Sequence, residues 1–319
     1  MLAIASSVVA CSSEGGGNAV TGGTRNGAAG ALSTGGGSGA SAGNDPQGGS
    51  AGHAPGSAGS APSGGVSSSA GAFNGGQSAS GGSSAAAGAS AAAGAGSNSY
   101  EPCPANGTPC KILPFGDSIT RGAKSSDDAG YRSQLFKLIV AANQRVTFTG
   151  SLANGPTQVS ARAFPRMHEG HPGWTIDPGY NTSGNYGGIS SLVPSPALSA
   201  GPNIILLQIG TNDLFFKDSA KMSERLEALL DKIAESAPSA LIVLAQITPL
   251  GSANAALTTY NGKIPGIVRS HVAKGQHIIG VDMSRLPLDQ LSDGTHPNDR
   301  GYAYMAGVWY AAIKDLLPK

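Results

Sequence analysis

Three residues of the types that perform acyl transfer lie in short polar segments of the sequence. Ser118 is in PFGDSIT, directly after an apolar stretch, and His296 is in DGTHPN, just ahead of the last helical pattern. Asp293 precedes His296 by three residues, so a loop can bring its carboxylate onto the imidazole. An imidazole held by a carboxylate can take the proton of a serine hydroxyl that attacks a carbonyl group. The pattern therefore indicates a nucleophile, a base and an orienting acid.

Two more residues have the chemistry of hydrogen-bond donors to an oxyanion. Asn212 follows the most apolar stretch, in GTND, and its side-chain amide can donate to a carbonyl oxygen that becomes negative. Gly173, in HEGHPGWT, can supply a backbone N–H where a side chain would block approach. Each candidate also has a simpler interpretation: Ser118 as a helix cap, Asp293 and Asn212 as turn formers, and His296 as a surface residue.

The elements that must position these residues alternate between apolar stretches and helical periodicity. Strands are predicted at residues 111–115, 146–149, 204–209, 241–247 and 277–281. Helices are predicted at residues 131–143, 223–235, 253–272 and 299–317. This alternation is typical of a parallel sheet between helices, which places its ligands at the carboxyl ends of the strands. Residues 153–200 are rich in Gly, Pro, Asn and Ser, and we expect a long functional loop there.

In this order, the segments resemble the SGNH (GDSL-type) hydrolases, which are named after four residues that are here Ser118, Gly173, Asn212 and His296. The resemblance covers residues 111–313 and is strongest toward the acetylxylan esterases of carbohydrate esterase family 3. The segments that carry it are PFGDSITRG, GYR, HEGHPGWTI, LLQIGTND, VDM and DGTHPNDRGY. It implies an α/β fold, a flavodoxin-like three-layer α/β/α sandwich around a five-stranded parallel sheet of order 2-1-3-4-5.

By this resemblance, the protein is a carboxylic ester hydrolase that removes short acyl groups, with acetyl expected, from a carbohydrate such as xylan. Ser118 is the expected nucleophile, His296 its base and Asp293 the orienting residue. The expected oxyanion hole has three donors: the backbone N–H of Ser118, the backbone N–H of Gly173 and the side chain of Asn212. Gly170 is the alternative to Gly173. No metal and no organic cofactor is expected.

Two features depart from the family pattern at the expected rim of the site. Pro172 stands where serine is common, and residues 181–191 read as an insertion, so the substrate range is left open. Four aromatic residues are candidates for substrate binding, with packing on the core as the alternative: Trp174, Tyr180, Tyr186 and Phe215. His168 and His171 flank Glu169, a spacing that a metal site could use, but the resemblance gives this segment a loop role instead.

The front of the chain has a composition of its own. Residues 1–11 end in VVAC, which looks like a bacterial lipobox with Cys11 as the lipidated residue, or else a secretory signal remnant. In residues 51–100, 41 of 50 side chains are Gly, Ser or Ala, so we expect residues 12–100 to be a disordered linker. Residues 101–319 form the predicted hydrolase domain. An exported protein is expected, as a cell-surface or outer-membrane lipoprotein or otherwise secreted.

The cysteine and charge content bears on disulfide formation and on binding of zinc, nucleic acid and membranes. Cys103 and Cys110 lie seven apart in a turn-rich segment, where an exported protein would form a disulfide, and further zinc ligands are not nearby. Residues 102–319 hold 19 Lys and Arg against 16 Asp and Glu, well interspersed, which gives no basic footprint for nucleic acid. The apolar runs are shorter than the roughly 18 residues of a membrane span, so contact with a membrane is expected only through Cys11.

Two alternative functions remain at this stage. One is a lipase- or thioesterase-type SGNH hydrolase, and the other is a non-catalytic carbohydrate-binding module at the cell surface. The complete set of nucleophile, base and oxyanion donors favours an enzyme, because binding alone does not need it. The polar loop at residues 153–200 favours a small acyl group on a large polar alcohol, so the expected partner is an acetylated polysaccharide or another short-acyl ester.

Overall fold

The computed structural model describes residues 100–216 and 218–319. The predicted lipidation at Cys11 and the predicted linker, residues 12–100, lie outside the described residues except for Tyr100, which is bonded to the domain. Within the described part of the chain, no helix is both long enough and apolar enough to cross a membrane.

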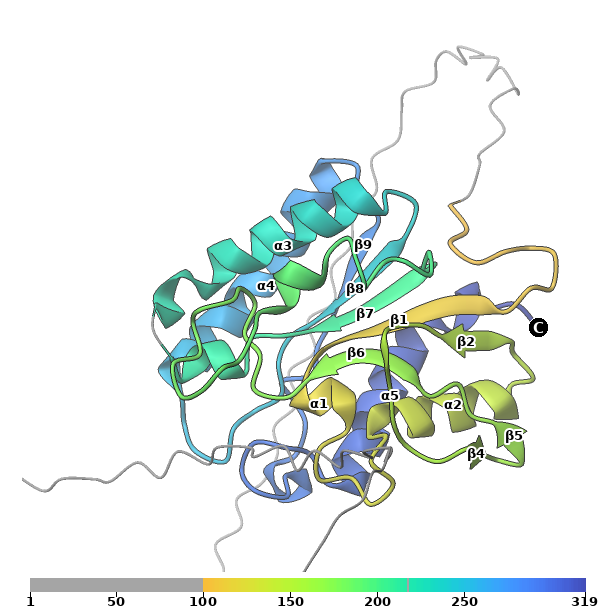
Figure 1. Ribbon diagram of the computed structural model, residues 1–319, viewed down its shortest axis with the longest axis horizontal. Coiled ribbons are helices and arrows are strands. Elements are labelled where there is room, and N and C mark those ends of the chain that lie inside the picture. The colour runs from red at the N-terminus through yellow and green to blue at the C-terminus, as the bar shows by residue number, and fades with distance from the viewer. Residues whose placement is uncertain (1–99, 217) are drawn as a thin grey trace, which may run out of the picture. The chain divides into compact units, whose positions relative to one another are not determined.

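A seven-stranded sheet forms the centre of the described domain (Figure 1). Its strands are β1 (Cys110–Asp117), β2 (Val146–Phe148), β3 (Leu152–Ala153), β6 (Met167–His171), β7 (Ile204–Gln208), β8 (Leu241–Ala245) and β9 (Ile278–Val281). Neighbouring strands follow the order β3-β6-β1-β7-β8-β9, and β2 also pairs with β1. All pairs are parallel except β3 with β6.

The predicted strand order 2-1-3-4-5 is confirmed, with one position divided between two strands. β2 pairs with the first half of β1, where Cys110 is opposite Val146. β6 pairs with the second half, where Asp117 is opposite His171. The second position of the order is therefore shared by β2 and β6, and β3 adds an antiparallel edge strand that the sequence did not predict.

Helices cover both faces of the sheet, which makes the predicted three-layer sandwich. The helices are α1 (Ser118–Arg121), α2 (Tyr131–Ala141), α3 (Met222–Ser236), α4 (Ala255–Ala273) and α5 (Asp299–Ile313). α3 and α4 lie on one face, and α2 and α5 lie on the other (Figure 1). Short 3₁₀ helices occupy Ile189–Leu192, Asn212–Leu214, Ser219–Lys221, Leu288–Gln290 and Lys314–Leu316.

Two apolar layers hold the sandwich together. Successive side chains of β1 point alternately into one layer and the other. Leu113 belongs to the layer under α3 and α4, and Ile112 to the layer under α2 and α5. On α3, the buried residues recur at helical spacing: Leu226, Leu229, Leu230 and Ile233. Trp309 of α5 is fully buried in the second layer. The central strands β7 and β8 are thereby buried along their whole length, as a parallel sheet covered on both faces requires.

The expectation of one long loop at residues 153–200 is wrong in part. The segment contains β6 and, before it, a hairpin of β4 (Gln158–Val159) and β5 (Arg162–Ala163). β6 escaped prediction because its sequence, MHEGH, has neither an apolar run nor an apolar alternation. Its polar residues are buried by partners from other segments, which single-sequence patterns do not show.

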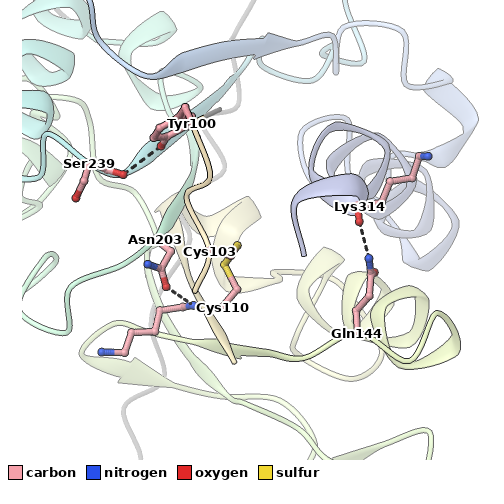
Figure 2. Close-up of a disulfide and its surroundings, with 8 residues drawn as sticks. Tyr100, Cys103, Cys110, Gln144, Asn203, Ser239 and Lys314 are labelled. Atoms are coloured by element: carbon pink, nitrogen blue, oxygen red, sulfur yellow. Dashed lines mark hydrogen bonds between the residues drawn. A yellow bond between two sulfur atoms is a disulfide. The ribbon is translucent and has the colours of Figure 1, made fainter. Parts of the chain in front are cut away.

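The start of the domain is fixed at the amino-terminal edge of the sheet. Cys103 and Cys110 form a disulfide, with their Cα atoms 5.0 Å apart (Figure 2). The Tyr100 ring stacks on His277 at 3.5 Å. Its hydroxyl donates to the Ser239 carbonyl at 3.1 Å (Figure 2). His277 and Ser239 directly precede β9 and β8, so the chain enters the domain at the edge opposite the carboxyl ends of the strands.

Candidate active site

The turn between β1 and α1 presents Ser118 at the carboxyl edge of the sheet. Asp117 caps α1, since its Oδ1 accepts the Ile119 N–H at 2.9 Å. The simpler interpretation of Ser118 as the helix cap therefore does not hold. Gly116 has to be glycine, because a Cβ there would lie 2.1 Å from the Gln208 carbonyl oxygen on β7.

Ser118, His296 and Asp293 form one connected hydrogen-bond chain. The Oγ of Ser118 lies 2.9 Å from the Nε2 of His296. The Nδ1 of the same ring lies 2.9 Å and 3.2 Å from the two carboxylate oxygens of Asp293. A proton on Nδ1 satisfies the carboxylate and leaves the Nε2 lone pair for the serine hydroxyl. Ser118 and His296 are each 5% exposed, so the pair is sheltered from bulk water.

The loop that carries Asp293 and His296 is closed by its own hydrogen bonds. The Ser292 N–H donates to the His296 carbonyl at 2.7 Å, and the His296 N–H donates to Asp293 Oδ1 at 2.8 Å. Directly after it, Asn298 caps α5 by accepting the N–H groups of Arg300 and Gly301. The start of α5 therefore fixes the position of the His296 imidazole.

The electrostatics of the three groups keep the orienting acid charged. Burial alone would raise the pKa of Asp293. The hydrogen bonds from the His296 backbone and ring, together with the charge of that ring, hold the pKa below its ordinary value. Asp293 is therefore a carboxylate across the neutral range, able to stabilise an imidazolium.

Asp117 is a further charged group at the site, and sequence reasoning missed it. The side chain is fully buried, and burial raises the pKa of Asp117 to about 6, against the hydrogen bond from Ile119 and the charge of His296. The signal was present in the same GDS segment, where an acid precedes the serine. An ionised Asp117 favours positive charge on His296.

The second candidate donor, Gly173, lies in a tight turn after β6. The Trp174 N–H donates to the His171 carbonyl at 3.2 Å, which closes the turn over Pro172 and Gly173. The φ of Gly173 is +78°, a value that the third position of a type II turn needs and that favours glycine. Gly170, the alternative, lies within β6, and its N–H already donates to the His168 ring at 2.9 Å.

Asn212 stands beside this turn, as the sequence predicts for the end of β7. Its Nδ2 donates to the Trp174 carbonyl at 2.8 Å, which orients the amide and leaves its second N–H for another acceptor. The next residue, Asp213, is buried and accepts the Ile176 N–H at 3.0 Å and the Arg225 guanidinium at 2.8 Å. The Asn212 and Trp174 segments are therefore tied together twice.

The four aromatic candidates lie in different surroundings. The Trp174 ring packs against the His171 ring at 4.4 Å and on the core. The Arg225 guanidinium lies 3.9 Å from the centre of the Tyr180 ring. The Tyr186 ring lies against Gly173. Phe215 has 53% of its surface exposed, more than the core packing considered for it would allow.

Side chains of the His168–His171 segment hold β6 in place through hydrogen bonds. Glu169 is fully buried and binds His171 Nε2 at 2.7 Å and the Ser151 N–H at 2.5 Å. Burial would raise the pKa of Glu169, but these hydrogen bonds hold it below its ordinary value. Burial lowers the pKa of His168 to about 2, so this ring is neutral. Within the described residues, no three His, Cys, Asp or Glu side chains are grouped to hold a metal ion.

Comparison with known proteins identifies the class to which this fold and site belong. The model of the GDSL-like lipase/acylhydrolase family matches residues 115–304. A multidomain esterase of Ruminococcus flavefaciens is 31% identical over 234 residues, which is 65% of this chain and 29% of that protein. A putative endoglucanase X of Acetivibrio thermocellus is 30% identical over 120 residues, 36% of this chain and 52% of that protein. The chain therefore spans only part of the length of both relatives.

Solved structures give the same result. A family 3 carbohydrate esterase of Clostridium thermocellum is 30% identical, with a TM-score of 0.56 over 66% of this chain and 98% of that one. A family 3 carbohydrate esterase from Talaromyces cellulolyticus shares the fold at 23% identity and a TM-score of 0.53. The domain is a carboxylic ester hydrolase, related to carbohydrate esterases. The chain belongs to the GDSL-like lipase/acylhydrolase family.

Proposed function

We propose that the protein is a serine esterase that removes short acyl groups, acetyl above all, from a carbohydrate such as xylan. The observation that carries this proposal is the 2.9 Å contact between Ser118 Oγ and His296 Nε2, continued at 2.9 Å from His296 Nδ1 to Asp293. The same three groups serve in both halves of an acyl-transfer reaction. No cofactor is needed for it.

In the first half, Ser118 Oγ forms a bond to the acyl carbon while its proton moves to His296 Nε2. The carbonyl electron pair moves onto the oxygen. When the tetrahedral intermediate collapses, the alcohol leaves and takes the proton from Nε2, and the acyl group stays on Ser118. In the second half, water gives a proton to Nε2 and attacks the same carbon. The carboxylic acid leaves, and the proton returns to Ser118.

Negative charge on the carbonyl oxygen is stabilised by three donors: the Ser118 N–H, the Gly173 N–H and the second N–H of the Asn212 amide. The start of α1 supports the first, because the initial N–H groups of a helix have no partner within it. The engagement of the Gly170 N–H by His168 favours Gly173 as the second. One such donor contributes about 3–4 kcal/mol to transition-state stabilisation.

Two observations support an acylated carbohydrate as the substrate: the related proteins and the composition of the segment beside the site. The solved relative at 30% identity is a family 3 carbohydrate esterase. The segment beside the site, residues 177–188, is rich in Gly, Asn and Tyr, which suits a hydroxylated alcohol part more than a long acyl chain. Among the aromatic candidates, Phe215 is exposed and its N–H donates to the Asn212 carbonyl at 3.1 Å, so we propose that its ring contacts the ligand.

The disulfide supports a proposal for the compartment. Cys103–Cys110 bridges persist in oxidising surroundings, so we place the enzyme outside the cytoplasm. The domain boundary at residue 101 and attachment through Cys11 belong to the same proposal.

The test is acetate release from acetylated xylan, measured beside hydrolysis of aryl esters with acyl chains of two to about eight carbons. We expect acetate release from xylan and a kcat/KM for aryl esters that falls as the chain lengthens. Ser118→Ala serves as the blank. A kcat/KM that rises with chain length, with xylan untouched, would instead assign a lipase-type activity.

A further inference from the structure

The sequence of the turn that carries Gly173 favours the observed form without excluding a second one. A turn of this length exists in two forms, type I and type II, which differ by a flip of the central Pro172–Gly173 peptide. Proline suits the second position of both forms, and glycine accepts both signs of φ. The flip reverses the direction of the Gly173 N–H. Proline followed by glycine favours type II, the observed form, in which the φ of Gly173 is +78°, and contacts from outside the turn can hold the glycine in it.

Asn181 makes a direct contact with this glycine. Its Nδ2 donates to the Gly173 carbonyl at 2.7 Å, and the side chain is nearly buried, with 6% of the residue exposed. Its Oδ1 accepts the N–H of Ser183 at 3.0 Å and the hydroxyl of Ser183 at 2.8 Å. Both ends of the amide are therefore bonded, so the Nδ2 atom is held toward Gly173 in one orientation.

Tyr186 also contacts this turn. A Cβ on Gly173 would lie 2.6 Å from a carbon of the Tyr186 ring, so the ring packs against the glycine itself. The chain then returns alongside the residue that follows the turn. The Thr175 N–H donates to the Gly187 carbonyl at 3.3 Å, and the Ile189 N–H donates to the Thr175 carbonyl at 3.0 Å. The segment of residues 181–189 thus packs along the turn of residues 171–174.

We propose that Asn181 is a positioning residue that holds Gly173 through its carbonyl, so that the Gly173 N–H stays aimed at the developing oxyanion. The proposal rests on the proposed function, since it concerns the second donor of that oxyanion hole. It gives a role to the insertion at residues 181–191, because its residues 181–189 complete the site rather than only shaping its rim.

The matched pair of variants is Asn181→Asp and Asn181→Ala. Aspartate keeps the size of the side chain but puts an acceptor opposite the Gly173 carbonyl, and alanine removes the contact. Full loss of an oxyanion donor lowers kcat by roughly 100- to 1000-fold, so a misdirected donor is expected to lower it by at least about tenfold. KM for 4-nitrophenyl acetate is expected to stay within about twofold of the wild-type value. Asn203→Ala is the control, because the Asn203 side chain also bonds to the backbone, its Oδ1 accepting the Lys111 N–H at 2.9 Å, but at the opposite edge of the sheet.

A second measurement separates positioning from a loss of structure. Phenylboronic acid forms a tetrahedral anion on an active-site serine and needs the oxyanion donors, so its Ki is expected to rise by the same factor as kcat falls. Thermal unfolding reports the folded state of each variant. If Asn181→Asp and Asn181→Ala keep wild-type kcat and Ki while Ser118→Ala is inactive, the inference is wrong and the proposed function stands. A changed KM at constant kcat would also overturn it, whereas activity in Ser118→Ala would overturn the proposed function itself.

Discussion

The Oγ of Ser118 lies 2.9 Å from the Nε2 of His296, although 178 positions separate the two residues in the chain. α5 makes this meeting possible. Its Tyr302 hydroxyl donates to the Ala123 carbonyl at 2.7 Å, and the carboxylate of Asp299, at its start, accepts the Ser126 N–H at 2.8 Å. The helix that follows the histidine is thus bonded to the segment that follows the serine.

Replacing Asn212 by alanine is expected to lower kcat by roughly a hundredfold, because the oxyanion loses one of its donors. The change also removes the 2.8 Å bond to the Trp174 carbonyl, so thermal unfolding has to be recorded together with kcat. Asn106→Ala, in the exposed turn near the disulfide, is the control and should behave as wild type. A kcat within twofold of wild type in a folded Asn212→Ala protein would remove this residue from the oxyanion hole.

Replacing Asp293 by asparagine is expected to lower kcat by at least about a hundredfold and to move the acid limb of the pH profile to lower pH. The pKa of Asp293 lies below its ordinary value, so the group is negative throughout the range where an ordinary imidazole titrates, near about 6.5. Its charge favours the imidazolium, and without that charge the imidazolium forms only in more acidic solution. The profile of kcat/KM between pH 4 and 8 measures this. An acid limb that stays in place would show that Asp293 does not act on the base.

Asp117 should make the fold less stable as the pH rises from about 4 to about 6. Because burial raises the pKa of Asp117 to about 6, the native state binds a proton in this range that the unfolded chain has already lost. Its contribution to the free energy of unfolding therefore falls as the pH passes through the range, by up to about 3 kcal/mol, and is constant above it. Asp117→Asn lacks this contribution.

Urea unfolding at pH 4 and at pH 7 checks the prediction. The difference in unfolding free energy between Asp117→Asn and wild type should become more favourable to the variant at pH 7 than at pH 4. The comparison between proteins cancels the titration of the other acids. An identical difference at both pH values would contradict the assigned pKa.

Replacing Arg225 by methionine is expected to lower the free energy of unfolding by about 3–5 kcal/mol, because it leaves the buried Asp213 carboxylate without its cation. The double variant Asp213→Asn with Arg225→Met should recover much of this loss, since asparagine can still accept the Ile176 N–H. Chemical unfolding of the three proteins measures both effects. An Arg225→Met protein as stable as wild type would show that the Asp213–Arg225 ion pair contributes little to the free energy of unfolding.

The fold was predictable to the extent that apolar periodicity marks its elements. Residues 204–209 read as a buried strand, and β7 spans Ile204–Gln208 with every residue buried. Residues 223–235 read as an amphipathic helix, and α3 spans Met222–Ser236. β6 was missed because Glu169 is buried through its bonds to His171 and Ser151, which are contacts between segments and leave no periodic pattern.

Some residues of the candidate site could be predicted from the sequence, and others could not. Ser118, Asn212 and His296 each follow or precede a recognisable element, so the sequence could place them at one edge of the sheet. Asn181 could not be found from sequence, because its role depends on a bond to a carbonyl eight residues earlier in an aperiodic segment. Asp117 was likewise invisible as a titrating group, since its raised pKa comes from burial that only the packed structure defines.

The most direct test of the central claim is the site of covalent attachment by a serine-directed fluorophosphonate, mapped by mass spectrometry of peptides. We predict a single adduct on Ser118 in the wild-type protein, no adduct in Ser118→Ala, and loss of ester hydrolysis in that variant while its thermal unfolding is unchanged. An adduct on a different residue, or a Ser118→Ala protein that hydrolyses 4-nitrophenyl acetate at the wild-type rate, would contradict the account.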